Sequence, residues 1–416
     1  MYVITENSTI EFMDLIHRND DGEIIVGNKQ QSSYVVIDSI GYESLKLFSE
    51  GLTVRGVKNR LKLKYSNETE DIVIKDFLET FIEAGLIKRI NGIEVLIKHS
   101  ENISFRIPFS VKTAKILCST YAIFIYVMFI IASGYLVLYN PQIRPTFSDF
   151  FVFDRLFFLL IFMTLTGWLM TLFHEMGHLI AAKSLEIDAN VQLSSRLFFT
   201  VAQTTVTNLW SIPRNKRSQV YIAGMLVDLL IISVIVVTIY LFEIIENIPS
   251  SMLGVLLRIV MSMQLMKIAS QLLIILRSDF YYIIANWSNS NDLYSESISL
   301  LKNIAIHIRK GKLPFDHELF THQYSQRQKV IVVMFSIALL INWLIVAIIF
   351  VLFIIPSLYN LVMNIIVPVI SSGKITDPLF DTLLLFILVA INLILPIKQL
   401  LNKKYKQKTN IVCDVI

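Results

Sequence analysis

The chain has 416 residues, of which 54% are hydrophobic, and its mean hydropathy is +0.61. A soluble domain of average composition is less apolar and carries more charge than the 17% found here, so the composition excludes an ordinary, wholly soluble protein. The net charge of +4 is too small to indicate a nucleic-acid-binding protein, and two cysteines are too few for a disulfide framework or a cysteine zinc site.

The first hundred residues have a mixed composition and predict a small soluble domain. No secretory signal is expected, because MYVITENSTIEFMDL lacks a basic start and an apolar core. From residue 33 to 90 the pattern predicts a short β-branched strand followed by three amphipathic helices, the last ended by Gly85. The apolar residues expected to face the core are Leu45 and Phe48 in the first helix, Val57 and Leu61 in the second, and Ile74, Phe77, Leu78 and Phe81 in the third.

Six apolar runs that follow are long enough to cross a bilayer. They are Ile116–Leu138, Leu156–Ala182, Val220–Phe242, Met252–Leu276, Val330–Ile355 and Leu379–Ile397. Basic residues concentrate before the first run, in the second and fourth gaps and in the tail from residue 398 to 416, and are almost absent from the other gaps. The positive-inside rule then predicts six spans with both termini in the cytoplasm. The apolar segment Ser357–Ser372 is interpreted as re-entrant or interfacial, with a seventh span as the alternative.

The second apolar run contains the sequence HEMGH, with His174 and His178 four residues apart. On a helix this spacing puts both imidazoles on one face, where they can bind one metal ion. Glu175 can act as general base on a metal-activated water. Ionisable side chains are costly in a membrane span and normally mark function, which disfavours a chance pair of histidines. His174 lies about 27 Å along the helix from Leu156, near the cytoplasmic end of a span that runs from outside to inside.

A catalytic zinc site needs a third protein ligand and one open position. Asp279 follows the fourth run at its cytoplasmic end, and Asp228 lies about eight residues into the third, roughly 12 Å from the cytoplasmic edge. We favour Asp279 as the ligand and interpret Asp228 as a polar neighbour of the site, with the reverse assignment left open. Lys267, near the middle of the fourth run, is expected to face the bundle or a water-filled cavity.

Between about residues 164 and 293 the chain resembles the site-2 protease family of intramembrane zinc metalloproteases, particularly its bacterial peptide zinc metalloprotease branch. The resemblance rests on HEMGH at 174–178, a polar segment ending in RNKR, the pair Ala223-Gly224, and Asp279 before a tyrosine-rich stretch. Two departures occur. AGMLVD stands where the family has AGPxxN, and Phe280 follows Asp279 where the family has glycine.

The resemblance implies that His174, His178 and Asp279 bind zinc and that Glu175 activates water. It also implies an edge strand near the site that pairs with an extended substrate. The alternating segment from residue 191 to 205, VQLSSRLFFTVAQTT, could serve in this way by β-augmentation. An interfacial hairpin that only covers the site is the equally weighted alternative.

Residues 33–90 resemble the PqqD-like winged-helix domain, also known as the RiPP recognition element, in VIDSIGYESLKLF and FLETFIEAGLIK. That family binds leader peptides of ribosomally made, modified peptides by adding the leader as a strand to its sheet. The resemblance implies that residues 1–99 recognise a peptide precursor. A domain with only a scaffolding role is the alternative.

We therefore expect a mainly α protein: a six-helix polytopic bundle (116–397) in a bacterial cytoplasmic membrane. A small N-terminal α+β winged-helix-like cytoplasmic domain (1–99), a linker (100–115) and a basic cytoplasmic tail (398–416) complete it. The expected activity is zinc-dependent endopeptidase cleavage of a bacteriocin-like peptide precursor during maturation or export, with a peptide-export ABC transporter as a candidate partner and no nucleic acid. The alternatives are regulated intramembrane proteolysis of a signalling protein, and a non-proteolytic membrane partner of a peptide exporter that holds zinc for structure alone.

Overall fold

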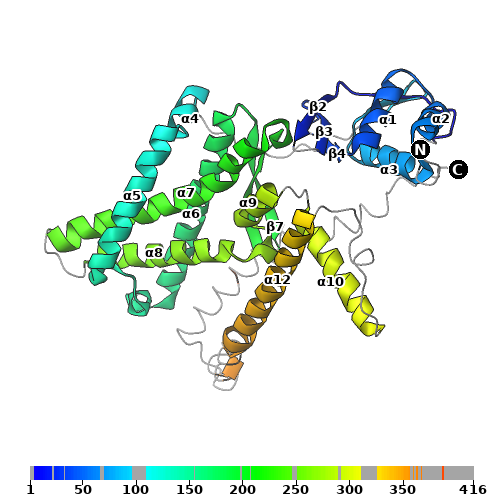
Figure 1. The fold of residues 1–416 in the computed structure, drawn as a ribbon. Coiled ribbons are helices and arrows are strands. Elements are labelled where there is room, and N and C mark those ends of the chain that lie inside the picture. Colours follow the sequence, from blue (N-terminus) through cyan, green and yellow to red (C-terminus); the bar gives the residue numbers. More distant parts are fainter. Residues whose placement is uncertain are drawn as a thin grey trace.

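The computed structural model describes residues 4–356, except 21–22, 32, 66–69, 96–108, 154, 197–198, 207, 246–250, 289–291 and 311–325. Beyond 356 it describes only residues 359, 362, 363, 367 and 387. The predicted sixth span, the basic tail and most of the segment 357–372 therefore lie outside the described residues. The described part is mainly helical and carries a small N-terminal domain with strands, drawn in blue in Figure 1.

The N-terminal domain contains two antiparallel three-stranded sheets. The first has the order β2 (Ile16–Asp20), β3 (Glu23–Asn28), β4 (Ser33–Ile37), and the second the order β1 (Ile10–Phe12), β5 (Ile87–Ile90), β6 (Ile93–Glu94). Asn91 and Gly92, both with positive φ, form the two-residue turn between β5 and β6, a backbone that Asn-Gly adopts readily. Only the strand near residue 33 was expected. Strand β1 is three residues long and β2 reads IHRND, so neither carries a clear apolar alternation.

Three helices, α1 (Ser39–Ser49), α2 (Val54–Lys64) and α3 (Glu70–Glu83), pack against these strands around one apolar core. The side chains of Asp38 and Thr53 cap α1 and α2 by accepting backbone N–H bonds. Gly85, with φ +66, follows the end of α3 where the sequence predicted a stop. Leu45 is partly buried, and the other residues expected in this core are all buried: Phe48, Val57, Leu61, Ile74, Phe77, Leu78 and Phe81.

Five described helices are long and apolar enough to cross a membrane. They are α5 (Thr120–Tyr139), α6 (Leu156–Ser184), α7 (Arg214–Ile239), α8 (Met252–Gln271) and α12 (Gln326–Ile349), and they overlap the first five predicted spans. Shorter elements connect them: α4 (Val111–Leu117), a hairpin of β7 (Ala189–Arg196) and β8 (Phe199–Val206), the 3-10 turn η3 (Leu209–Ser211), α9 (Asp279–Ser288) and α10 (Leu293–Arg309).

The end of α8 differs from the prediction in a way that shapes the site. The helix stops at Gln271 rather than Leu276, and a 3-10 turn, η5 (Ile274–Leu276), follows. Arg277 then adopts a left-handed backbone with φ +49, and the Ser278 hydroxyl donates a hydrogen bond of 2.6 Å to the Gln271 carbonyl. The chain therefore turns sharply before α9. Apolar residues continue through the turn, which is why hydropathy alone extended the span.

Helix α7 is central to the bundle and packs against α5, α6, α8 and α9. The hydroxyls of Ser133 and Ser233 join α5 to α7 at 2.9 Å. A Cβ built on Gly177 of α6 would lie 2.8 Å from the Ala223 carbonyl of α7, so this glycine permits a very close helix approach. Helix α9 is held from its other side by an apolar cluster that includes Tyr281 and residues of α10 and α12.

Candidate metal centre

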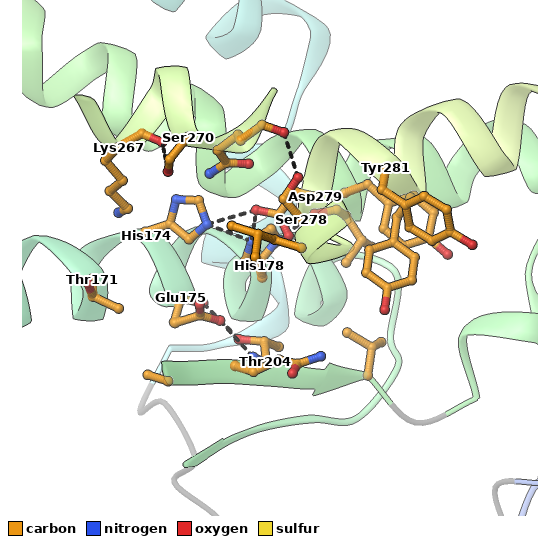
Figure 2. A pocket seen from close by; sticks show the side chains of 18 of the residues that line it. Thr171, His174, Glu175, His178, Thr204, Lys267, Ser270, Ser278, Asp279 and Tyr281 are labelled. Atoms are coloured by element: carbon orange, nitrogen blue, oxygen red, sulfur yellow. Dashed lines mark hydrogen bonds and ion pairs between the residues drawn. The ribbon is translucent and has the colours of Figure 1, made fainter. Parts of the chain in front are cut away.

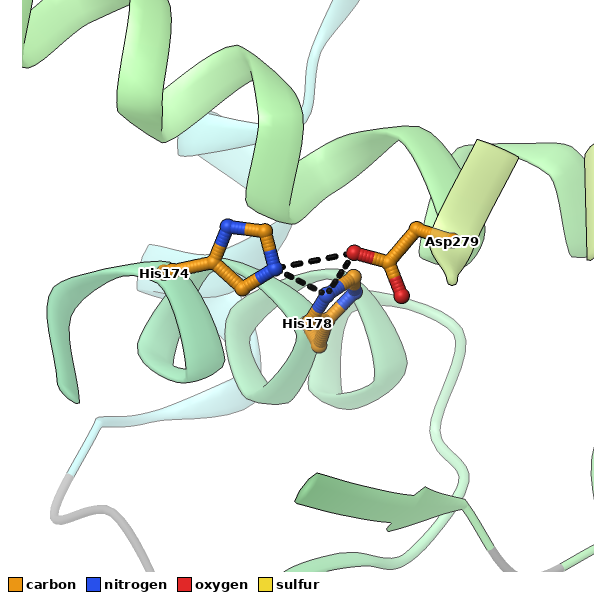
Figure 3. Close-up of side chains that lie close together, drawn as sticks. All are labelled: His174, His178 and Asp279. Carbon is orange, nitrogen blue, oxygen red and sulfur yellow. Dashed lines mark hydrogen bonds and ion pairs between the residues drawn. The ribbon is translucent and has the colours of Figure 1, made fainter. Parts of the chain in front are cut away.

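His174, His178 and Asp279 come together on facing elements (Figure 3). The two histidines project from α6, and Asp279 begins α9. Asp279 Oδ2 lies 2.8 Å from His174 Nε2 and 3.2 Å from His178 Nε2, and the two Nε2 atoms are 3.2 Å apart. Both histidines are buried, and Asp279 is partly exposed.

The second nitrogen of each histidine has its own partner. His178 Nδ1 donates to the Val220 carbonyl at 2.7 Å, so Nε2 is the nitrogen that faces His174 and Asp279. His174 Nδ1 donates to Asp228 Oδ2, also at 2.7 Å. Carbonyl or carboxylate partners of this kind orient histidines that bind metals. Asp228 therefore lies behind His174, on the side away from Asp279.

Lys267 and Asp228 form an ion pair beside the histidines. The Lys267 ammonium, from α8, donates to Asp228 Oδ1 at 2.9 Å and to the Met170 carbonyl at 3.3 Å. Asp228 is fully buried, so its charge requires such a partner. Lys267 also lines the cavity described below, in agreement with the expectation that it faces the interior.

Gly224 of α7 lies directly against the two imidazoles. A Cβ built on Gly224 would lie 2.6 Å from His174 Nε2 and closer still to His178 Nε2. Any larger residue would therefore occupy the space in front of the two nitrogens. The pair Ala223-Gly224, noted in the sequence as a point of resemblance, has a steric role here that does not depend on that resemblance.

Glu175 points from α6 towards the hairpin (Figure 2). Its carboxylate accepts a hydrogen bond of 2.7 Å from the backbone N–H of Thr204 in β8. Because that N–H is directed at α6, it belongs to the edge of β8 that does not face β7. Glu175 thus sits between the histidine face of its own helix and an edge strand.

A cavity of about 820 Å³ is lined by His174, Glu175, His178, Lys267 and Asp279. Its walls come from α6, β8, η3, α7, α8 and α9, and its volume is within the range of ligand sites in proteins. Glutamines 264 and 271 on α8 also line it, and both are buried. These glutamines and Trp210 were not identified from the sequence, since no spacing pattern links them to the histidines. Thr204 belongs to the segment 191–205 that the sequence offered as an edge strand or a covering hairpin, but its contact with Glu175 was not predicted.

The electrostatic setting favours an ionised Asp279. Burial would raise the pKa of this carboxyl group, but hydrogen bonds with His174 and His178 hold the pKa well below its ordinary value. Its neighbour Tyr281 anchors α9 through a ring contact with Phe335 of α12, with centroids 5.9 Å apart. Burial raises the pKa of Tyr281 to about 12, so this side chain is neutral.

The donor set fits a zinc ion. Three ligands bound about 2.0–2.2 Å from a tetrahedral zinc would lie about 3.3–3.5 Å from one another. The two spacings of 3.2 Å come close to this range, whereas His174 Nε2 and Asp279 Oδ2, at 2.8 Å, would have to move apart slightly to hold the ion. Two imidazoles and one carboxylate form a known type of catalytic zinc site that keeps a fourth position open. Gly224 has no side chain that would fill the fourth position, and the cavity adjoins the histidines, so a water or substrate group has room there.

The N-terminal domain contacts the loop that follows β8. The Tyr34 hydroxyl of β4 donates to Asn208 Oδ1 at 2.6 Å, and Arg18 of β2 donates to the Ser211 carbonyl at 3.3 Å. Behind the loop, the buried Arg217 of α7 donates to the carbonyls of Trp210 and Ile212. The loop is therefore held by α7 and carries the contact with the N-terminal domain next to the cavity.

Comparison of the chain with models of protein families, with curated proteins and with solved structures gives no match in any of the three. The two resemblances stated from the sequence therefore rest on the motifs alone.

Proposed function

We propose that the protein is a membrane-embedded zinc endopeptidase that cleaves a ribosomally made peptide precursor during its maturation or export. The observation that carries the proposal is the convergence of His174, His178 and Asp279 beside Glu175 in one cavity of an apolar helical bundle. Burying two histidines and a carboxylate in an apolar bundle costs free energy, and a bound cation would offset that cost. Hydrogen bonds to the second ring nitrogen of each histidine are typical of histidines that bind metals.

His174, His178 and Asp279 would hold the metal, with Asp228 and the Val220 carbonyl fixing the two rings. Zinc bound there would polarise the peptide carbonyl and lower the pKa of a water to about 7. Gly224 would keep the face in front of the rings open.

Glu175 would act as the general base and then as the general acid. Its carboxylate takes a proton from the water whose oxygen attacks the peptide carbonyl carbon. As the C–N bond breaks, the same proton passes to the leaving nitrogen, which departs as an amine. The Thr204 N–H holds the carboxylate in the cavity from one oxygen, Oε2, and leaves Oε1 for this transfer.

The substrate side of the proposal rests on the N-terminal domain. Its two contacts with the loop at Asn208 and Ser211 put a small strand-containing domain next to the cavity. A leader captured by residues 1–99 would thus be delivered beside the site. This arrangement favours a peptide precursor over a membrane-spanning signalling protein as the substrate.

The proposal is tested by comparing wild type with Glu175→Gln at matched protein levels, by mass spectrometry of the producer's peptides and by zinc analysis of the purified protein. We expect uncut precursor to accumulate in the variant while zinc content stays at the wild-type level, because Glu175 is not a ligand. His174→Ala should lose both zinc and cleavage. An unchanged product pattern in Glu175→Gln would refute the proposal and point to the structural-zinc alternative.

A further inference from the structure

We propose that the cavity binds the unwound main chain of its peptide substrate along α8, where Gln264 donates to a substrate carbonyl and Gln271 accepts from a substrate N–H. This inference rests on the proposed function and names a substrate contact that the metal group does not provide. Three observations carry it: two buried amide atoms, the spacing between them, and the paired charge that lies between them.

Two glutamines of α8 line the cavity and are almost fully buried. Gln264 is 1% exposed and Gln271 is 7% exposed. Within the described part of the chain, Gln264 Nε2 and Gln271 Oε1 are buried atoms without a hydrogen-bond partner. An amide nitrogen donates and an amide oxygen accepts. Leaving such groups unpaired costs free energy, so a donor and an acceptor held against a cavity indicate a ligand that supplies a partner for each.

The polar side chains on the facing wall of α6 are already bonded. The two helices approach closely here, because a Cβ built on Gly167 would lie 3.4 Å from the Met263 methyl group. Thr164 and Thr171 of α6 also line the cavity, and their hydroxyls donate to carbonyls of their own helix at 2.7 and 2.9 Å. A polar ligand between α6 and α8 would therefore find its partners on the α8 side.

The two glutamines mark a line that starts beside the metal group. The Gln271 carbonyl accepts a hydrogen bond of 2.6 Å from the hydroxyl of Ser278, the residue before Asp279. Gln264 precedes Gln271 by seven residues, which is close to two helical turns, so both lie on one face of α8 about 10 Å apart. A ligand that contacts both would extend from the metal group along this helix.

Lys267 lies between the glutamines and also lines the cavity. Its ammonium donates to the Asp228 carboxylate at 2.9 Å, so its charge is balanced within the bundle. Neutral polar groups therefore suit this wall better than charged ones. Figure 2 shows Lys267 on the α8 side of His174 and Thr204 of the hairpin on the other side, so this wall is separate from the hairpin.

An unwound peptide main chain supplies neutral donors and acceptors at the required spacing. A helical peptide uses its N–H and C=O groups internally. An extended peptide rises about 3.3 Å per residue and presents the N–H and C=O groups of alternate residues on one edge. Three extended residues thus cover about 10 Å. The first N–H and the third C=O of such a stretch match the separation of Gln271 and Gln264.

Peptide binding tests the inference without requiring hydrolysis. The full chain with Glu175→Gln is purified in detergent, alone and with Gln264→Met or Gln271→Met. The probes are two pools of fluorescein-labelled decapeptides with the same randomised side chains. One pool has ordinary amide linkages, and the other has interior ester linkages, which keep the C=O and remove the N–H. Gln219→Met is the matched control, because the amide of Gln219 in α7 already donates to Ser184 Oγ at 3.1 Å.

Fluorescence anisotropy should show that Gln264→Met and Gln271→Met each weaken binding of the amide pool at least about fivefold, or ~1 kcal/mol. Gln219→Met should leave this affinity unchanged. With the ester pool, Gln271→Met should have no effect, since the N–H that it accepts is gone, whereas Gln264→Met should still weaken binding. The Tm of both ligand-free variants should stay at or above the parent value, because methionine fills the same space with apolar atoms.

No measurable binding of the amide pool would overturn the inference, as would an unchanged affinity in either variant. Equal losses with both pools in Gln271→Met, or a lowered Tm alongside weaker binding, would also overturn it. Cleavage of the unlabelled amide pool by the protein with native Glu175 is measured separately. Glutamine-dependent binding without cleavage would reject the proposed function alone, and cleavage with glutamine-independent binding would reject this inference alone.

Discussion

The N-terminal domain and the membrane bundle bury opposite kinds of side chain. Among the described residues of the N-terminal domain, the buried ones are almost all apolar, and the few buried polar ones are Ser8, Asn28 and Ser44. In the bundle, large apolar residues cover the outside, and ionisable and amide side chains are found inside. The buried ones include His174, Glu175, His178, Arg217, Asp228, Arg258, Gln264 and Gln271.

The difference follows from the solvent. Water drives apolar groups inward, whereas lipid tails are as apolar as leucine and leave polar groups to gather inside. Burial of a residue in the N-terminal domain therefore indicates that it belongs to the folded core. Burial of a polar residue in the bundle indicates a functional site or a structural ion pair. Arg258 illustrates the second case, since it pairs with Asp149 at 3.2 Å, well away from the histidines.

The largest expected change in stability comes from breaking the ion pair of Asp228 and Lys267. Lys267→Met alone leaves a buried carboxylate without its cation, and we expect the free energy of unfolding to fall by about 3–5 kcal/mol. Asp228→Leu alone should cost a similar amount, and the double variant should cost less than the sum of the two. The measurement is unfolding of the detergent-purified protein. If the costs of the two substitutions add up in the double variant, the two charges do not stabilise each other, which would contradict the prediction.

Two exposed apolar residues should respond differently to the same substitution. Ile131 of α5 and Leu63 of α2 are 60% and 88% exposed, and only α5 is long and apolar enough to cross a membrane. Ile131→Arg should make the free energy of membrane insertion of α5 less favourable by about 2.5–3.5 kcal/mol. Leu63→Arg should change stability by less than about 0.5 kcal/mol. The yield of protein in the membrane fraction checks the first prediction, and the thermal stability of the purified protein checks the second. Equal responses would contradict the assignment of α5 to the bilayer.

The glycines of the two regions also differ. Gly51, Gly85 and Gly92 of the N-terminal domain have positive φ, whereas Gly224 is helical and serves close approach. Gly224→Ala should lower zinc affinity at least about 100-fold, because the new Cβ would crowd both Nε2 atoms. Gly134→Ala, at an open position of α5, is the control and should leave affinity unchanged. Competition with a zinc chelator measures this, and a harmless Gly224→Ala would mean that α7 can move away from α6.

The smallest effect concerns the water-exposed surface of the N-terminal domain. A hydrogen bond from Lys64 lowers the pKa of Glu43 below its ordinary value of 4.5. The pair therefore contributes stability above pH 4.5 that is lost as pH falls through the lower, folded-state pKa. The stability difference between wild type and Glu43→Gln, followed by hydrogen exchange of α1 and α2 in the full protein, should shrink across that window and also at high salt. A difference that is constant with pH would show that the carboxylate charge is not involved.

Periodicity and hydropathy predicted much of this architecture. The seven core residues from Phe48 to Phe81 and the overlap of five apolar runs with five helices follow from local pattern alone. The pairing of His174 with His178 needed only helical spacing. Hydropathy could not locate the end of α8, because the turn at Arg277 depends on a left-handed backbone that apolar neighbours do not reveal.

Contacts between distant segments were beyond the sequence. The Thr204 N–H reaches Glu175 only because the hairpin folds back under α6, and Lys267 reaches Asp228 only because α8 crosses α7 at that depth. In the sequence, topology and a motif favoured Asp279 over Asp228 as the third ligand and left the reverse assignment open. The structure places the two carboxylates on opposite sides of His174. Their roles towards a metal stay predictions until zinc is measured in the variants.

The third member of the metal group stands 105 residues after the first and belongs to a short helix held by α10 and α12. During synthesis, therefore, both histidines enter the membrane well before Asp279 has been translated, and α9 gains its support only after α12 has followed. A nascent chain that stalls or inserts incompletely would hold two histidines and a glutamate but no complete ligand set. The topology thus delays completion of this three-residue group until assembly of the helices is nearly finished.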